Sequence, residues 1–160
     1  MKRSESVLGS TFPMRPIGTV RSPYSDRTQV PKGAGARHDA EGVLEISAEF
    51  EEGLKDIEGF SHLYVLWVFH QARGYELLAI PPTDDRPHGV FATRSPQRPN
   101  PIGLTVVRLI RREGPRLLVH GVDMLDGTPI LDVKPYLSSV PEVELKRGWM
   151  TDAEARTKRG

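Results

Sequence analysis

Short apolar runs, each ended by Gly, Pro or Asp, constrain the fold of this chain more than any other feature. Their alternating or continuous apolar pattern is typical of strands. The stretch 48–60 differs, because Phe50, Leu54 and Ile57 share one helical face, and it predicts one short helix. The sequence therefore predicts an all-β fold, an antiparallel sheet that either forms a sandwich or closes on itself. The expected strands lie within 14–24, 41–47, 62–71, 88–94, 104–113, 115–125 and 128–136.

The most apolar run, 62–71, predicts a central strand buried on both faces, because its hydrophobic residues are nearly continuous. It ends in His70 and Gln71. A barrel mouth or sheet edge would expose both side chains. His70 is therefore a candidate functional residue, and hydrogen bonding at the strand end is the alternative.

Length and composition exclude several classes of protein. A chain of 160 residues suits one domain, with an ordered core at about 13–148 and loose ends at 1–12 and 149–160. The formal net charge of +1 gives no global attraction to nucleic acid. Cysteine is absent and the five histidines lack metal-ligand spacing, so we expect no metal site. The longest apolar run, 63–69, is too short to span a bilayer, and the expected localisation is cytoplasmic.

The segment 92–103, ATRSPQRPNPIG, predicts a stiff loop, because its three prolines exclude a helix and a central strand. It carries Arg94, Arg98 and Asn100. Planar groups of this kind bind carboxylates, phosphates or base edges, and a rigid loop loses little entropy when they do. The pattern therefore indicates a binding site.

A second polar segment, DMLDGTP at 123–129, combines Asp123 and Asp126 with a strong turn signal. The simpler interpretation is that Asp126 and Thr128 bind the backbone of their own loop. The functional interpretation is that this acidic segment and the cationic loop 92–103 together bind a zwitterion. Dinucleotide-binding, P-loop and serine-nucleophile motifs are absent; GAGA at 33–36 precedes a strand instead of the required helix.

Three blocks resemble the TrmO family, the TsaA-like tRNA methyltransferases: GFSHLYVLWVFHQ, GVFATRSPQRPNPIGLTVVRL and DMLDGTPILDVKPYL. The resemblance covers roughly 14–138. It implies a single-sheeted antiparallel β-barrel that binds S-adenosyl-L-methionine and works as a homodimer. It also implies methylation of N6 of threonylcarbamoyladenosine at position 37, in the tRNA anticodon loop.

The resemblance implies a cofactor site in which Arg94 pairs with the methionine carboxylate. Asp126 would bind a ribose hydroxyl or the ammonium group, and Leu104 would cover the adenine. The chain departs from the family at Lys32 and Gly33, where many members carry Arg and Gln. The full expected cofactor set is Pro31, Lys32, Gly33, His70, Gln71, Arg94, Leu104, Asp123, Met124, Leu125 and Asp126.

Methyl transfer to this nitrogen also requires loss of a proton. The titratable candidates are His70, Asp126 and Tyr136, and proton loss to water is the alternative. Arg98, Asn100 and Lys134 are expected to contact RNA, whereas the arginines at 108–112 are better explained as a solvated strand end. Two other functions remain open: a noncatalytic S-adenosylmethionine sensor, and an RNA-binding barrel without cofactor.

Overall fold

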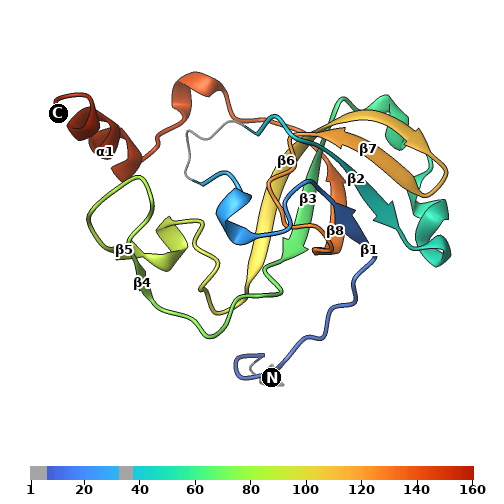
Figure 1. Cartoon of the computed structure of the whole chain (residues 1–160), viewed down its shortest axis with the longest axis horizontal. Coiled ribbons are helices and arrows are strands. Elements are labelled where there is room, and N and C mark those ends of the chain that lie inside the picture. The colour runs from blue at the N-terminus through green and yellow to red at the C-terminus, as the bar shows by residue number, and fades with distance from the viewer. Residues whose placement is uncertain (1–6, 33–37) are drawn as a thin grey trace, which may run out of the picture.

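The computed structural model describes residues 7–32 and 38–160. Six antiparallel strands close into one barrel in the order β1-β2-β7-β6-β3-β8 (Figure 1). The closed form of the expected sheet is therefore confirmed. The barrel strands are β1 (Gly18–Arg21), β2 (Glu41–Ile46), β3 (His62–Val68), β6 (Ile102–Glu113), β7 (Arg116–His120) and β8 (Pro129–Pro135).

The hydrophobic core fills the inside of the barrel, because every second side chain of each strand points inward. In β3 the inward residues Leu63, Val65 and Trp67 are buried, whereas Tyr64 and Leu66 between them are partly exposed. The prediction that this strand is buried on both faces was therefore wrong. A continuous apolar run does not distinguish a strand covered on both sides from one with an apolar outer face.

Gly103 allows the largest core side chain to fit. It lies opposite Trp67 in the β3–β6 register, and the indole ring occupies the space that a Cβ at residue 103 would need. Trp67 Nε1 donates a hydrogen bond to Thr105 Oγ1 at 3.0 Å inside the barrel. The glycine at the end of the proline-rich loop is thus required by packing.

The alternating strand directions bring several loops to one end of the barrel. Strands β1, β3 and β7 end there, and β2, β6 and β8 begin there. We call this end the loop rim; it comprises 22–32, 38–40, 69–77, 92–101 and 121–128. The opposite end carries the 3₁₀ turns η2 (Ala48–Leu54) and η3 (Ile57–Gly59), where the sequence predicted a helix.

Between β3 and β6 the chain forms an arm that projects from the barrel (Figure 1). The arm contains the short hairpin β4 (Leu78–Ala79) and β5 (His88–Gly89), where a longer strand was expected, and the turn η4 (Val90–Ala92). The helix α1 (Trp149–Thr157) packs on it, although 149–160 was expected to be a loose end. Trp149 stacks on His88 with ring centroids 4.3 Å apart and donates Nε1 to Ala92 O at 2.8 Å. The remaining short turns are η1 (Arg27–Gln29) and η5 (Glu142–Glu144).

A buried carboxylate fastens α1 to the arm. The Asp84 side chain is only 2% exposed; it accepts a hydrogen bond from Arg156 Nη2 at 2.6 Å and lies 2.8 Å from His88 Nε2. The hydrogen bond with His88, and to a lesser extent Arg156, holds the pKa of Asp84 well below its ordinary value of 3.8. A lowered pKa in the folded state stabilises the fold above the unfolded value, and this contribution is lost as pH falls through the folded value.

We expect Asp84→Asn to release α1 from the arm at neutral pH, because the amide loses the negative charge that pairs with Arg156 of the helix. The wild-type chain should release it only in acid, below the ordinary pKa of an aspartate. Limited proteolysis within 149–160, together with the emission of Trp149, measures the release. Asp85→Asn is the matched control, because the Asp85 side chain is 89% exposed. Equal cleavage of wild type and Asp84→Asn would contradict the assignment.

Candidate functional site

Asp123 is the most constrained acidic residue of the loop rim. Its Oδ1 accepts a hydrogen bond from Thr105 Oγ1 at 2.6 Å, and its Oδ2 lies 3.8 Å from His38 Nδ1. Burial raises the pKa of Asp123, and the Thr105 hydroxyl and the charges of His38 and Arg94 oppose this rise only in part. The carboxylate is therefore held in a poorly hydrated place but still reaches the rim, with 22% of its side chain exposed.

A chain of side-chain contacts connects the barrel core with this carboxylate. Trp67 donates to Thr105, and Thr105 donates to Asp123. Since the indole is packed against Gly103 and Thr105 is buried, the orientation of the carboxylate is determined from inside the barrel. Hydrogen bonds from buried side chains are a common means by which proteins hold a reactive or binding group in one geometry.

The two segments predicted to bind a zwitterion meet at the loop rim. Arg94 is exposed on loop 92–101, and its charge is close enough to lower the pKa of Asp123 on the other segment. The sequence predicted that Arg94 and Asp126 would bind the two ends of one zwitterion. In the structure, the Arg94 charge lowers the pKa of Asp123, although burial raises that pKa more.

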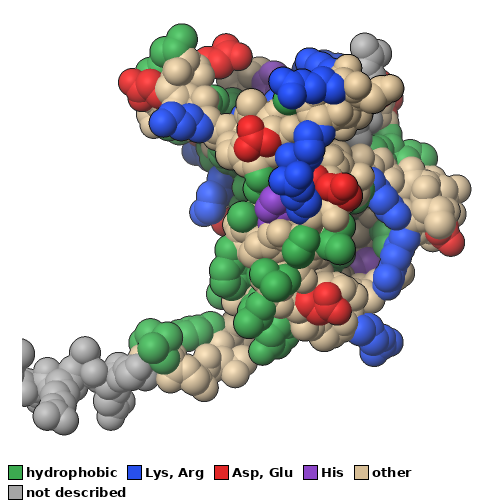
Figure 2. Space-filling view, turned by 90° about the vertical axis from the view of Figure 1, so that its left-hand side faces the viewer, with side chains coloured by type: hydrophobic (Ala, Val, Ile, Leu, Met, Phe, Trp, Pro, Cys, Tyr) green, Lys and Arg blue, Asp and Glu red, His purple; other side chains and the backbone are tan. Residues whose placement is uncertain are grey.

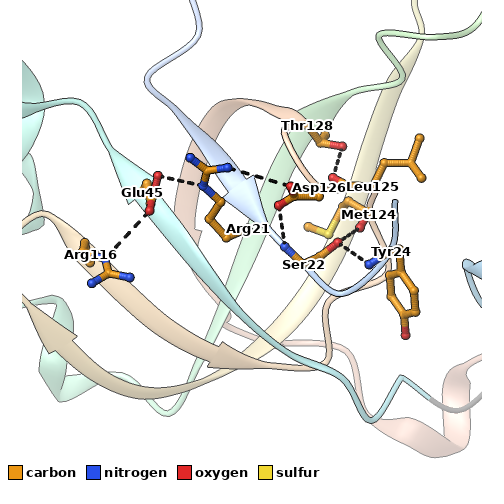
Figure 3. A network of polar contacts seen from close by, with 9 residues as sticks. All are labelled: Arg21, Ser22, Tyr24, Glu45, Arg116, Met124, Leu125, Asp126 and Thr128. Carbon is orange, nitrogen blue, oxygen red and sulfur yellow. Dashed lines mark hydrogen bonds and ion pairs between the residues drawn. The ribbon is translucent and has the colours of Figure 1, made fainter. Parts of the chain in front are cut away.

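Asp126 instead fastens its loop to the end of β1 (Figure 3). Its Oδ1 accepts the Ser22 N–H at 3.1 Å, and its Oδ2 lies 3.8 Å from Arg21 Nη1. Ser22 Oγ adds a bond to the Met124 carbonyl at 2.6 Å, and the Met124 side chain is buried in the core. These contacts support a structural role for Asp126, and its predicted cofactor contact remains a prediction.

The Thr128 hydroxyl donates to Leu125 O at 2.6 Å, within its own turn (Figure 3). This is the backbone-satisfying role that the simpler interpretation of the segment expected.

The remaining cofactor candidates surround the same rim. Arg27 Nη2 donates to the Gln71 carbonyl at 2.6 Å, which brings the loop containing Pro31 and Lys32 to the end of β3. His70 is exposed beside Gln71. Leu104 lies on the outer face of β6 and is 43% exposed. Leu125 is partly exposed in the 121–128 connection, and Gly33 lies outside the described residues.

Two candidates lie at the other end of the barrel. The Tyr136 N–H donates to His62 O, at the start of β3, so roughly 20 Å of strand separates it from the loop rim. Within one chain the structure therefore does not bring Tyr136 to the expected pocket. Lys134 lies near the end of strand β8, and its Nζ pairs with Asp132 Oδ2 at 2.8 Å.

The polar groups of loop 92–101 divide between internal and outward contacts. Arg98 Nη1 donates to the carbonyls of Thr93 and Ser95, at 3.0 and 3.2 Å, and thus stiffens the loop. The Asn100 carbonyl accepts from Ile102 N–H at 2.7 Å, and its side chain lies at the exposed surface. At the other end of the barrel, Arg111 is exposed and pairs with Glu113, as expected for a solvated strand end. Arg112 is only 19% exposed and binds the Glu58 carboxylate and the Leu54 carbonyl, so it is held in the structure instead.

Comparison with known proteins gives the family. The model of the tRNA-methyltransferase O N-terminal domain matches residues 19–141. The chain belongs to the TrmO family. A probable S-adenosyl-L-methionine-binding protein of Pyrococcus abyssi is 50% identical over 148 residues, which cover 90% of this chain and 79% of the relative. A crystal structure of TrmO from Pseudomonas aeruginosa superposes with a TM-score of 0.70 at 37% identity, over 86% of this chain and 62% of that one.

The tRNA (adenine(37)-N6)-methyltransferase of Escherichia coli is also similar, at 39% identity over 138 residues. The match covers 80% of this chain and 59% of that enzyme. The chain therefore spans about six tenths of the E. coli relative and of the P. aeruginosa structure.

Sequence reasoning missed three residues that the structure brings to this candidate site: His38, Thr105 and Trp67. A signal existed for Thr105, because it is the polar member of the inward-facing series in an apolar strand and needs a buried partner. No comparable signal marked His38, whose position depends on backbone bonds between 38–40 and 121–122. Gly121 N–H donates to Ala40 O at 2.8 Å there.

The described residues show neither a metal-ligand cluster nor a membrane-spanning helix. No group of three or more His, Asp or Glu side chains within 7–32 and 38–160 is arranged to hold a metal ion. Over the same ranges, no helix combines the length and apolarity needed to cross a bilayer.

Proposed function

We propose that this chain is an S-adenosyl-L-methionine-dependent methyltransferase that modifies N6 of adenosine 37 in tRNA, with threonylcarbamoyladenosine as the acceptor. The observation that carries the proposal is that the loop of Arg94 and the segment of Asp123 lie at the same rim of a TrmO-family barrel. The relatives named as S-adenosyl-L-methionine-binding proteins and as a tRNA methyltransferase support the cofactor and the reaction.

The charges of the rim fit the amino-acid end of the cofactor. The Arg94 guanidinium suits the carboxylate, because it offers two parallel donors. The connection 121–128, which carries Asp123 and Asp126 at the same rim, suits the ammonium group. Gln71, Lys32 and Leu104 add a polar and an apolar wall for the nucleoside. The bound cofactor supplies an electrophilic methyl group on a sulfonium, whose departure leaves a neutral thioether and needs no acid.

The anticodon loop requires contacts beyond those of the cofactor. Arg98, Asn100 and Lys134 remain the proposed RNA-binding residues. Lys134 lies far from the rim within one chain, so its contact with the same tRNA would involve a different part of that molecule. Anticodon-loop binding in the cytoplasm is the setting that this function implies.

We also propose that the protein acts as a homodimer. Apolar side chains stand on the outer face of β6 and on the arm, and Figure 2 shows hydrophobic side chains gathered on the side of the molecule that carries the arm. Exposed apolar surface of this kind is typical of protein interfaces. Sedimentation velocity of the purified chain tests the proposal. The exposed apolar residues meant here are Ile102, Leu104 and Val106 on β6 and Tyr75, Leu77, Leu78, Ile80 and Phe91 on the arm.

Methyl-labelled S-adenosylmethionine and two tRNA substrates test the reaction. We expect label in tRNA that carries threonylcarbamoyladenosine at position 37 and none in tRNA that lacks the threonylcarbamoyl group. Cofactor binding without transfer to either tRNA would instead indicate a noncatalytic sensor. Binding of tRNA without any cofactor binding would indicate a plain RNA-binding barrel.

A further inference from the structure

The reaction needs a group that accepts the proton of N6, and the groups expected for this task are poorly placed. Tyr136 lies at the other end of the barrel, and Asp126 already binds Ser22 and Arg21. His70 is exposed beyond the end of β3. A general base works best when a second group orients it and stabilises its protonated form.

His38 has such a group beside it. Its Nδ1 is fully buried and has no hydrogen-bond partner, and the nearest acceptor is Asp123 Oδ2 at 3.8 Å. Buried nitrogens without a partner are rare in folded proteins, and catalytic hydrogen bonds are often long before substrate binds. About a third of the His38 side chain is exposed, so the ring is not enclosed by the protein although its Nδ1 is.

Contacts from the barrel core orient the Asp123 carboxylate toward His38. Thr105 occupies Asp123 Oδ1, which leaves Oδ2 for the imidazole, and Trp67 fixes the Thr105 hydroxyl. Burial leaves the Asp123 carboxylate poorly hydrated and raises its pKa. The charged carboxylate therefore gains more from a neighbouring imidazolium than an exposed carboxylate would. Arg94 is the other charged group that acts on Asp123 from a neighbouring segment.

We propose that His38 is the general base of methyl transfer and that Asp123, held by Thr105 and Trp67, orients it. This assignment rests on the proposed methyltransferase function. The N6 lone pair forms the bond to the methyl carbon while the S–CH₃ bond breaks and its electrons pass to sulfur. The N6–H proton passes to His38 Nε2. The imidazolium, paired with the Asp123 carboxylate, then loses that proton to water.

Single-turnover methyl transfer at saturating cofactor tests the assignment across pH. We expect His38→Gln to lower the rate about 100-fold, the lower end for loss of a general base, and to change the rate's pH dependence. Cofactor affinity should stay within about twofold. Thr105→Val should lower the rate about 10-fold and also change the pH profile, since it releases Asp123 without touching substrate. His62→Gln, at the opposite end of the barrel, is the histidine control.

Chemical rescue separates a base from a structural residue. Added imidazole should restore part of the rate of His38→Ala and leave the wild type unchanged. The assignment is overturned if His38→Gln keeps the wild-type rate, or if the rate falls with an unaltered pH profile and no rescue. A wild-type chain that transfers no methyl group to either tRNA would instead count against the proposed function itself.

Discussion

Gly103→Ala is expected to lower the free energy of unfolding by about 3 kcal/mol, at the upper end of the usual cost of overpacking a core. The added methyl group would occupy the position of the Trp67 indole, directly across the β3–β6 ladder. Neither partner can move easily. Gly103 is held by strand pairing, and the indole is packed in the core and bonded to Thr105.

Denaturant unfolding measures this effect, with Gly53→Ala as the matched control. Gly53 has open space where its Cβ would stand, so alanine there should leave stability unchanged or slightly raised. Gly103→Ala should also disturb Asp123, because Thr105 bonds both to the Asp123 carboxylate and to the displaced Trp67 indole. A loss below about 1 kcal/mol would show that the ring has another place to go and would refute the packing argument.

Arg94→Ala is expected to weaken S-adenosylmethionine binding about 10- to 100-fold, in keeping with the loss of one charge-assisted, bidentate contact. Arg94 is exposed and supports no core residue, so the melting temperature should stay close to that of the wild type. Arg94→Lys should bind with intermediate affinity, because lysine retains the charge but not the planar pair of donors.

Calorimetric titration with the cofactor measures these affinities. Arg111→Ala is the control, because that exposed arginine pairs with Glu113 on β6, at the end away from the loop rim. Unchanged affinity in Arg94→Ala would show that Arg94 does not bind the cofactor carboxylate. Removal of the Arg94 charge should also raise the pKa of Asp123 further.

The barrel could be predicted because its causes are local. Apolar alternation, with a Gly, Pro or Asp at the end of each run, predicts the strands, and the six barrel strands overlap the stretches where strands were expected. The hairpin β4–β5 on the arm does not match the longer strand expected at 88–94. The elements that were not predicted depend on contacts with residues far away in the sequence. The helix at 149–157 forms on the arm through Trp149 and Arg156, whose partners His88, Ala92 and Asp84 lie far away in the sequence.

The site was predictable to the level of its loops. Proline and turn chemistry identified 92–103 and 123–129 as stiff polar segments, and family resemblance connected them with one cofactor. Which aspartate fastens its own loop and which is buried against Thr105 was not predictable, because Asp123 and Asp126 have the same chemistry. Their roles separate only when β1 supplies Ser22 and Arg21 to one, and the barrel core supplies Thr105 to the other.

By itself the sequence determined the short strands, the stiff loops and the family, since these depend on backbone preferences and on motifs contiguous along the chain. Only the tertiary structure decided that His38, Thr105 and Asp123 stand together. Barrel closure brings residues from three distant segments to one rim, and the orphaned nitrogen, the burial of the carboxylate and its link to Trp67 all arise from that closure.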